Sequence, residues 1–216
     1  MPKSKPHLQK EIALLKQGYH FVAGLDEAGR GARAGPVVAA AVILPLDQPQ
    51  LSQILTGLDD SKKLTPRQRE VYFEKIQNTA AAVAVGIAPP ELVDEINVVQ
   101  ATRRAMEQAL NQLSVTPAYL LLDHLRLPAV DIPQDSFPKA DSISLTVAAA
   151  SVVAKVTRDR LMVELSQQYP GYGFERHKGY GTLIHRKALQ QLKPCVVHRM
   201  SYRPVQMVLA GDSISR

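Results

Sequence analysis

An uninterrupted apolar segment constrains the fold of this 216-residue chain more than any other feature. Residues 37–44 read Val-Val-Ala-Ala-Ala-Val-Ile-Leu, with no polar side chain at any position. A strand with one solvated face alternates apolar and polar residues, so a strand of this composition needs cover on both faces. Helices on both sides of a sheet supply that cover. We therefore expect residues 35–46 to form an interior strand of an α/β sheet.

Strand and helix patterns alternate along the rest of the chain. We expect further strands over 21–26, 81–88 and 119–123, at most a short strand over 131–139, and helices over 11–17, 66–79, 97–113 and 182–192. Thr65-Pro66-Arg67-Gln68 has the form of a capping box with Pro at the first helical position. Asp141 is expected to open a long helix, whose small residues over 147–154 permit close approach to the sheet. Pro204 is expected to break a last segment, and the ends, 1–8 and 211–216, to fray.

Composition narrows the class of protein. The length suits one domain, and the single Cys195 excludes an intramolecular disulfide framework. The first ten residues are basic and polar and lead into no apolar segment, and no stretch reaches the about 18 apolar residues of a membrane span. We expect a cytoplasmic protein without a membrane partner.

The positive charge of the chain is concentrated in its last third. The formal net charge is +6, and residues 151–216 hold 11 Lys and Arg against 4 Asp and Glu. Such a bias suggests a surface that meets a polyanion, of which nucleic acid is the commonest. Many ordinary proteins are also basic, so charge alone leaves an unspecialised surface equally open.

Two adjacent acids follow the first predicted strand in the stretch Gly-Leu-Asp-Glu-Ala-Gly-Arg-Gly at 24–31. Placing Asp26 beside Glu27 is electrostatically unfavourable unless a positive charge lies close, and a divalent cation supplies it most simply. Gly29 and Gly31 flank Arg30, and residues without a Cβ allow backbone N–H groups to approach a phosphate or ribose. The alternative is a hydrophilic turn after a strand.

Two more acids lie where elements are expected to begin or end. Asp123 ends a short apolar strand, and Asp141 starts a helix. Asp141 has the alternative role of a helix N-cap, and Asp123 that of a residue leading into a loop. Four carboxylates gathered where strand ends meet helix starts would bind Mg²⁺ or Mn²⁺. Because adjacent strand residues face opposite sides, the first strand is expected to end or kink at Asp26 and Glu27.

Three lysine or tyrosine positions are candidates for nucleic-acid contacts. Lys62 and Lys63 precede a predicted helix and suit phosphate binding, although paired lysines are usually just solvated. Tyr180 lies between two glycines, where its ring can stack on a sugar or base or instead pack over the C-terminal helix. The histidines of the last third match no common zinc spacing, and we assign no catalytic role to them: His177, His185 and His198.

These motifs together resemble the ribonuclease HII family, the type 2 ribonucleases H. The resemblance rests on blocks that run in family order from about residue 20 to 205: GLDEAGRG and AGPVVAAAV (24–31, 34–42), LDDSKKLT (58–65), LLD (121–123), KADSISLTVAAASVVAKVTRDRLM (139–162), YPGYGFERHKGYGTLIH (169–185) and HRMSYRPV (198–205).

The resemblance implies a ribonuclease H-like α/β fold: a central mixed sheet of five strands, the first three antiparallel, with helices on both faces. The catalytic domain would span 18–216, with a small C-terminal helical part at about 182–216, and residues 1–17 would be an extension with a short helix. By motif, the four acids that bind two divalent metals, Mg²⁺ or Mn²⁺, and carry catalysis fall on Asp26, Glu27, Asp123 and Asp141. Contacts to nucleic acid would fall on Gly29, Arg30 and Gly31 for the ribose, Tyr180 for the nucleotide across the cut, and Lys62 and Lys63.

The implied activity is that of an endoribonuclease. It would hydrolyse the RNA strand of RNA–DNA hybrids and nick duplex DNA on the 5′ side of an embedded ribonucleotide, leaving 3′-hydroxyl and 5′-phosphate ends. Its partners would be RNA–DNA hybrid and ribonucleotide-containing duplex DNA, and the protein would act as a monomer in DNA replication and repair.

The sequence departs from the family pattern at three positions. His124 stands where glycine usually follows the third acid, Ala140 replaces a glycine before the fourth, and Arg33 occupies a position that is more often apolar. These departures bear on the loop beside Asp123 and on metal preference or rate. Two alternatives stay open: another nuclease or strand-transferase of the same superfold, and a nucleic-acid-binding protein without catalysis.

Overall fold

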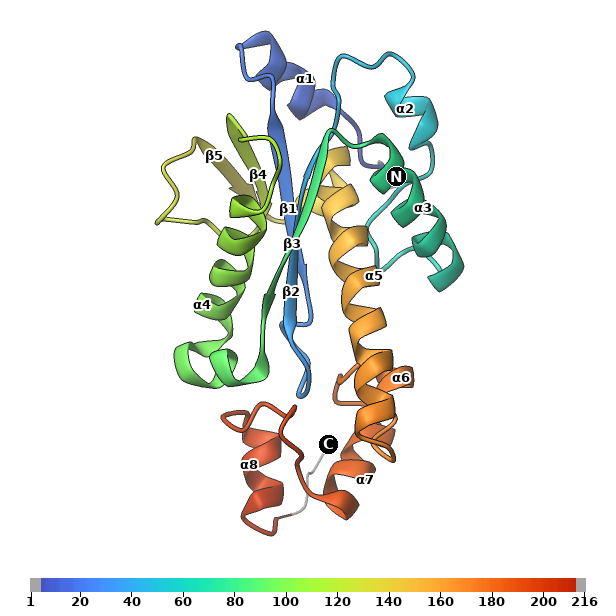
Figure 1. The fold of residues 1–216 in the computed structure, drawn as a ribbon, viewed down its shortest axis with the longest axis vertical. Helices are drawn as coiled ribbons and strands as arrows, with labels where there is room; N and C mark the ends of the chain where they lie inside the picture. Colours follow the sequence, from blue (N-terminus) through green and yellow to red (C-terminus); the bar gives the residue numbers. More distant parts are fainter. Residues whose placement is uncertain (1–4, 213–216) are drawn as a thin grey trace.

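The computed structural model describes residues 5–212 and contains one five-stranded mixed sheet (Figure 1). Its strands, in the spatial order β3-β2-β1-β4-β5, are β1 Val22–Ala28, β2 Val37–Ile43, β3 Ala82–Ala88, β4 Tyr119–Asp123 and β5 Gln134–Phe137. The first three strands pair antiparallel, whereas β4 lies parallel to β1 and β5 lies parallel to β4. The expected α/β fold class is confirmed.

Helices cover both faces of the sheet, as the apolar composition of β2 requires. All seven residues of β2 are buried. On one face lies α4 (Pro90–Asn111), and on the other lies α5 (Leu145–Gln168), with α3 (Pro66–Thr79) packed beside it (Figure 1). Alternate residues of the strands feed two separate apolar cores, so that Ala39 and Ala41 pack toward α4 and Ala40 and Val42 toward α5.

Two glycines allow these helices to lie directly on the sheet. A Cβ at Gly86 of β3 would be 1.9 Å from the carbonyl oxygen of Ala105 in α4. A Cβ at Gly24 of β1 would be 2.5 Å from the carbonyl carbon of Thr146 in α5. The small residues over 147–154 are all buried, which confirms the close approach that they predict.

Local signals set several helix ends. The capping box of α3 is present: Thr65 Oγ1 accepts from the Gln68 N–H at 3.3 Å, and Gln68 Oε1 accepts from the Thr65 N–H at 2.9 Å. Helix α4 begins at Pro90, earlier than the predicted start at Asn97. Asn97 has φ 67°, and its side chain accepts from the N–H groups of the next segment, so it caps the second half of a broken helix.

Two of the expectations about the acidic residues are wrong. Strand β1 neither ends nor kinks at Asp26 and Glu27, because it stays in register with β2 as far as the pair Ala28–Val38. Asp141 is not a helix N-cap: it lies in a 3₁₀ turn, Ala140–Ser142, and Ser144 caps α5 instead. The Ser144 side chain accepts from the Val147 N–H at 3.1 Å, which gives this short hydroxyl the role expected of the acid.

The two ends of the described chain are attached to the sheet domain. The N-terminal segment contains α1 (Gln9–Lys16), and a second short helix, α2 (Leu51–Ile54), follows β2. His7 pairs with Ser144, so the expected fraying does not extend to it; residues 1–4 and 213–216 lie outside the described part. Figure 1 shows the C-terminal helices gathered at one end of an elongated molecule: α6 Phe174–His177, α7 Leu183–Leu192 and α8 Arg203–Leu209.

Two features of these helices complete the fold. Pro204 lies in the first turn of α8 and does not break it, because proline tolerates a position where the N–H has no intrahelical partner. Within residues 5–212, no helix combines the length and the apolar composition needed to cross a membrane.

Candidate active site

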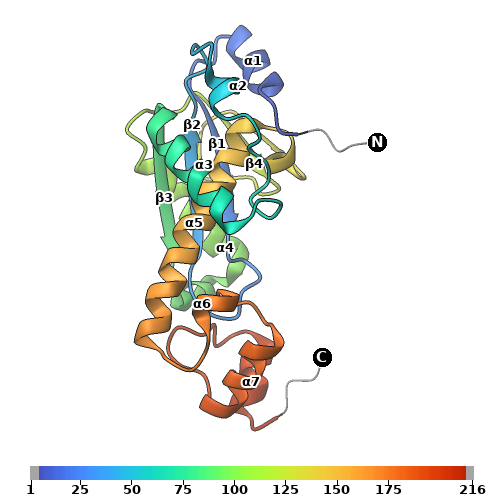
Figure 2. The ribbon, with the colours of Figure 1, turned by 90° about the vertical axis from the view of Figure 1, so that its right-hand side faces the viewer.

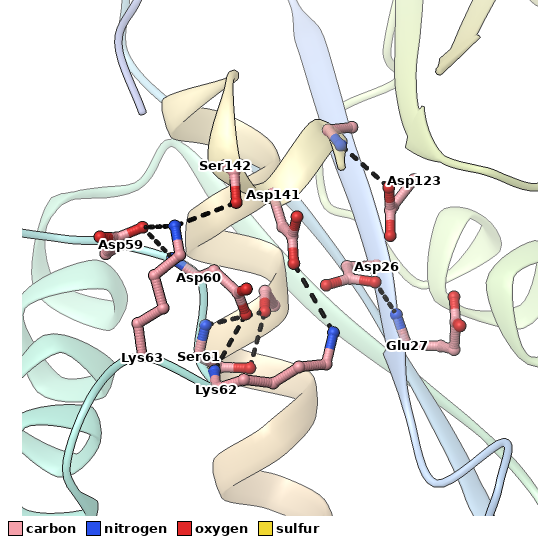
Figure 3. A network of polar contacts seen from close by, with 12 residues as sticks. Asp26, Glu27, Asp59, Asp60, Ser61, Lys62, Lys63, Asp123, Asp141 and Ser142 are labelled. Atoms are coloured by element: carbon pink, nitrogen blue, oxygen red, sulfur yellow. Dashed lines mark hydrogen bonds and ion pairs between the residues drawn. The ribbon is translucent and has the colours of Figure 1, made fainter. Parts of the chain in front are cut away.

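The four predicted carboxylates meet at one edge of the sheet. Leu25 of β1 pairs with Leu122 of the parallel strand β4, so the acids that follow, Asp26 within β1 and Asp123 at the end of β4, lie on adjacent strands. The 3₁₀ turn before α5 brings Asp141 to the same edge, and Figure 3 shows it facing Asp26. Glu27 extends from the other side of β1. The structure thus brings together acids that are far apart in sequence.

Burial and mutual repulsion perturb these carboxylates. Asp26 and Asp141 are each only 3% exposed. Burial raises the pKa of Asp26 well above its ordinary value, and the charges of Glu27, Asp123 and Asp141 raise it further. Burial, followed by the charges of Asp60 and Asp123, raises the pKa of Asp141 to about 6. The site therefore holds more negative charge than the protein itself stabilises.

The nearby cations offset only part of this charge. Lys62 Nζ lies 3.7 Å from Asp141 Oδ2, and Arg30 Nη1 lies 3.2 Å from Glu27 Oε1. Burial acts to lower the pKa of Lys62, but the charges of Asp26 and the neighbouring acids outweigh burial and raise it. The second oxygen of Glu27 is buried and has no hydrogen-bond partner among the described residues.

These observations fit divalent ions that are shared with a substrate. Carboxylate oxygens are the ligands that Mg²⁺ and Mn²⁺ prefer, and the unpaired oxygen of Glu27 and the repulsion at Asp26 both favour an added positive charge. Over residues 5–212, no three His, Cys, Asp or Glu side chains are grouped so as to enclose one ion by themselves. Mg²⁺ commonly uses one or two carboxylates and completes its shell with water and phosphate oxygens, which agrees with this spread arrangement.

Hydrogen bonds tie the strand end to the turn. Asp123 Oδ1 accepts from the Ala140 N–H at 2.9 Å, so the third acid is fixed to the backbone next to the fourth. His124, which follows Asp123, has φ 63°, a conformation that glycine adopts without strain. Ala140 is fully buried in the turn and has no positive φ. Of these two departures from the family pattern, only His124 is conformationally strained.

In the loop before α3, the side chains of the two predicted lysines point in different directions. Lys62 points into the carboxylates, whereas Lys63 Nζ donates to Asp59 Oδ1 at 2.7 Å and to Ser142 Oγ at 3.1 Å (Figure 3). Ser61 anchors this loop, because its hydroxyl is 2.8 Å from Ser151 Oγ on α5. The loop also places Asp60 beside Asp141, a neighbour that the sequence analysis missed although it lies next to the lysine pair.

Two cavities adjoin the carboxylates. One of about 440 Å³ is lined by residues that include Asp60, Lys63, Asp123 and Asp141. The other, of about 470 Å³, is lined by residues that include Glu27, Gly29, Arg30, Gly31, Lys155 and Tyr180. Lys62 lines both, so the cavity of the acids adjoins the cavity of the loop between β1 and β2, residues 29–36, called the glycine loop below.

Tyr180 lies at the edge of this region. Its ring centroid is 5.3 Å from the guanidinium carbon of Arg158 and 5.9 Å from Lys155 Nζ, both on α5. A Cβ at the preceding Gly179 would be 2.2 Å from the carbonyl oxygen of Ala34, so the tyrosine loop packs tightly on the glycine loop. The ring is therefore presented to the cavity, against α5.

Two buried arginines hold the glycine loop, and no sequence pattern predicted the role of either. Arg158 donates to the carbonyl oxygens of Pro36, Lys178 and Ala34 at 2.8, 2.9 and 3.1 Å. Arg199 donates to those of Gly29 and Arg30 at 2.7 and 2.8 Å. Both side chains are 0% exposed, and burial lowers the pKa of each. They join α5 and the C-terminal part to the loop that borders the acids.

The histidines form a separate buried cluster in the C-terminal part. The rings of His177 and His185 stack at 4.4 Å, and His185 Nε2 lies 3.1 Å from His198 Nε2. Cys195 Sγ is 3.2 Å from His198 Nδ1. None of these residues lines the two cavities beside the carboxylates. All three histidines are buried.

Comparison with known proteins gives a consistent result. The family model described as ribonuclease HII matches residues 23–205. Ribonuclease HII of Geobacter metallireducens is 52% identical over 196 residues, which is 91% of this chain and 90% of that protein. Ribonuclease HII of Geotalea uraniireducens is 49% identical over 205 residues, or 95% of this chain and 93% of that protein.

Solved structures show the same fold. Ribonuclease H2 of Pyrococcus horikoshii superposes with a TM-score of 0.78 at 28% identity, over 88% of this chain and 98% of that one. The ribonuclease HII in a complex with PCNA from Archaeoglobus fulgidus gives 0.71 at 28% identity, over 85% and 95%. Bst-RNase HIII, solved with Mn²⁺, gives 0.70 at 20% identity, over 94% and 74%, and shows the fold alone.

The relatives match nearly the whole chain with about half of the residues identical, and the sheet brings four acids together. Both observations agree on one family. The chain belongs to the ribonuclease HII family of nucleases.

Proposed function

We propose that this protein is an endoribonuclease that hydrolyses the RNA strand of RNA–DNA hybrids and nicks duplex DNA on the 5′ side of an embedded ribonucleotide. The observation that carries the proposal is that two cavities adjoin at Lys62, one lined by Asp123 and Asp141 and the other by Glu27 and the glycine loop. One region supplies metal ligands and the next a surface for a sugar. A nuclease that selects ribose needs both.

The carboxylates Asp26, Glu27, Asp123 and Asp141 would hold two ions of Mg²⁺ or Mn²⁺. When bound, such ions activate a water molecule on one side of the phosphodiester and stabilise the 3′-oxygen that leaves on the other. The chain's own groups position the acids: the Ala140 N–H orients Asp123, and Arg30 orients Glu27. Lys62, which already lies near Asp141, would contact a phosphate oxygen of the substrate.

Selection of ribose would come from the glycine loop. A buried donor or acceptor that pairs with the 2′-hydroxyl loses that partner when deoxyribose binds, and the unpaired group disfavours the wrong substrate strongly. Gly29, Arg30 and Gly31 border the cavity, and their backbone N–H groups would be the donors to the sugar. Tyr180 would stack on the nucleotide across the cut, and Lys63 would assist phosphate binding from the margin.

We further propose that residues 18–216 form the catalytic domain, that the helical part at about 182–216 supports the nucleic-acid surface, and that residues 1–17 are an extension. The protein would act as a monomer in the cytoplasm, in DNA replication and repair. The net positive charge of residues 151–216 supports a nucleic-acid surface that includes the C-terminal helical part.

The test is an analysis of the ends produced from an RNA–DNA hybrid. With Mg²⁺ or Mn²⁺, we expect 3′-hydroxyl and 5′-phosphate ends, and no cleavage with a chelator. Ends bearing a 2′,3′-cyclic phosphate would show that the 2′-hydroxyl is the nucleophile and would contradict metal-activated water. Equal cutting of an all-DNA duplex would favour another nuclease of the fold, and binding without cutting would favour a non-catalytic protein.

A further inference from the structure

Glu11 is a buried carboxylate that the proposed reaction does not use. It lies on α1, in the segment before the sheet, and its exposed fraction is 0%. Removing a carboxylate from water is costly unless hydrogen bonds compensate, so its partners indicate its role. Within residues 5–212, its side-chain hydrogen bonds all reach the N-cap and first turn of α5 through Oε1, and Oε2 is buried without a partner.

The segment from His7 to Glu11 completes the N-terminus of α5. Glu11 Oε1 accepts from Ser144 Oγ at 2.5 Å and from the Thr146 N–H at 3.0 Å, and the His7 carbonyl accepts from the Leu145 N–H at 3.2 Å. The first N–H groups of a helix have no intrahelical partners, and a negative charge is favourable beside them. Figure 2 shows this segment beside the start of α5.

The same contacts lead to the turn that carries Asp141. The Ile143 N–H closes the 3₁₀ turn on the Ala140 carbonyl at 3.0 Å, and the Ser144 N–H donates to the same carbonyl at 2.8 Å. The His7 N–H donates to the Ile143 carbonyl at 3.0 Å. The Ala140 N–H in turn donates to Asp123 Oδ1 at 2.9 Å. A continuous series of hydrogen bonds therefore runs from Glu11 through Ser144 and Ala140 to Asp123.

We propose that Glu11 is a positioning residue, which fixes the turn bearing Asp141 and thereby sets the separation of the carboxylates that bind the divalent ions. The inference rests on the proposed metal role of Asp141. The charges of Asp60 and Asp123 repel Asp141, so without a fixed turn it would move away from these acids. Glu11 itself contacts neither metal nor substrate.

The test compares Glu11→Ala and Glu11→Gln with Leu14→Ala. Leu14 is buried on the same helix, one turn later, in an apolar cluster with Val22, Leu121 and Ala140. Leu14→Ala therefore removes apolar packing beside the turn but no hydrogen bond to it. Mn²⁺ affinity is measured by calorimetry without substrate, and Tm without metal. Loss of a residue that orients metal ligands typically weakens binding by about 10-fold or more. We expect this loss in Glu11→Ala, with a lower kcat at unchanged KM.

The two other variants separate positioning from general stability. Glu11→Gln keeps an oxygen that accepts from Ser144 and Thr146, and we expect it to recover Mn²⁺ affinity to within about threefold of the unchanged protein. Leu14→Ala should lower Tm by at least as much as Glu11→Ala while leaving Mn²⁺ affinity within about twofold. Equal Mn²⁺ affinities in folded Glu11→Ala and Leu14→Ala would overturn the proposal.

Two further variants keep the outcome decisive. Ser144→Ala removes the same hydrogen bond from its other partner, so it should weaken Mn²⁺ binding even where Glu11→Ala does not fold, and unchanged affinity in Ser144→Ala would also overturn the proposal. Asp141→Asn tests the proposed metal role of Asp141, on which the inference rests. Full activity and Mn²⁺ affinity in Asp141→Asn would refute the metal role itself, whereas their loss together with an unaffected Glu11→Ala would refute only the positioning role.

Discussion

Arg199 Nη2 donates to the carbonyl oxygen of Gly29 at 2.7 Å, across 170 positions of sequence. The same guanidinium donates to the carbonyls of Arg30 and Gly35, so a residue before α8 fixes the loop that borders the acids. Each bond involves a charged donor in a buried setting, where hydrogen bonds to charged groups contribute about 1.5–3 kcal/mol. The C-terminal part is therefore a structural support of the proposed ribose site.

Replacing Arg199 by Met should impair recognition of ribose. The loop carbonyls at Gly29 and Arg30 lose their donors, and we expect cleavage at an embedded ribonucleotide to fall by roughly 10-fold or more, with a lower Tm. Arg203→Ala, at an exposed arginine of α8, is the matched control and should behave as the unchanged protein. Full cleavage activity in folded Arg199→Met would exclude a supporting role.

Asp26→Asn should stabilise the metal-free protein while abolishing activity. Burial and the charges of three neighbouring acids raise the pKa of Asp26, so a neutral amide relieves repulsion, and the free energy of unfolding at pH 8 should rise by roughly 1 kcal/mol. Activity should fall by roughly 100-fold or more. Exposed Asp47→Asn is the control for both measurements. Unaltered cleavage by Asp26→Asn would refute its metal role.

The position of three of the four acids was predictable from sequence, because these three end or follow strongly patterned strand segments. The apolar strand before Asp123 and the run before Asp26 fix where those acids emerge. The start of α5 was not predictable, because Asp141 and Ser144 are both good N-cap residues only three positions apart. In the structure Ser144 is the N-cap, and its hydroxyl donates to Glu11, a residue 133 positions earlier in the sequence.

Gly24→Ala should disrupt the contact between β1 and α5. The added Cβ would lie 2.5 Å from the Thr146 carbonyl carbon, a backbone atom that cannot rotate away. We expect a loss of roughly 3 kcal/mol in the free energy of unfolding by urea, together with weaker activity because Asp26 and Asp141 are carried by the two separated elements. Gly31→Ala, where a Cβ meets nothing within 4 Å, serves as the stability control. Equal stabilities would show that the helix adjusts freely.

The buried histidines should make the protein sensitive to acid. Burial lowers the pKa of His198 to about 4, whereas the unfolded chain has the ordinary value near 6.5. Between these values the unfolded state binds a proton that the folded state does not, so stability is lost as pH falls from about 6.5 to 4.

His198→Gln should remove this part of the pH dependence. We expect the difference in the free energy of unfolding between pH 7 and 4.5 to shrink by roughly 2 kcal/mol, measured by urea titration at both values. The exposed His20→Gln should leave the difference unchanged. A dependence in His198→Gln as steep as in the unchanged protein would place the acid sensitivity elsewhere.

The contacts that escaped prediction share one property: they join segments far apart in sequence through buried polar groups. Arg158 and Arg199 read as ordinary basic residues, yet their partners are backbone carbonyls of the glycine loop rather than acids. The kink expected at Asp26 and Glu27 failed for another reason: Glu27 reaches the site from the other side of β1, so the two adjacent acids need no break in the strand. Periodicity reports burial of apolar faces but not such pairings.

The measurement that tests the account most directly is the position of the nick in a labelled DNA duplex that contains one ribonucleotide, beside an all-DNA control, with Mg²⁺, Mn²⁺ or chelator. The 2′-hydroxyl of that ribonucleotide can attack only the phosphate on its own 3′ side, so a cut on the 5′ side requires an activated water. The account predicts a metal-dependent 5′ nick that is absent from the control. A 3′ cut, a cut that persists with chelator, or cutting of both duplexes would contradict it.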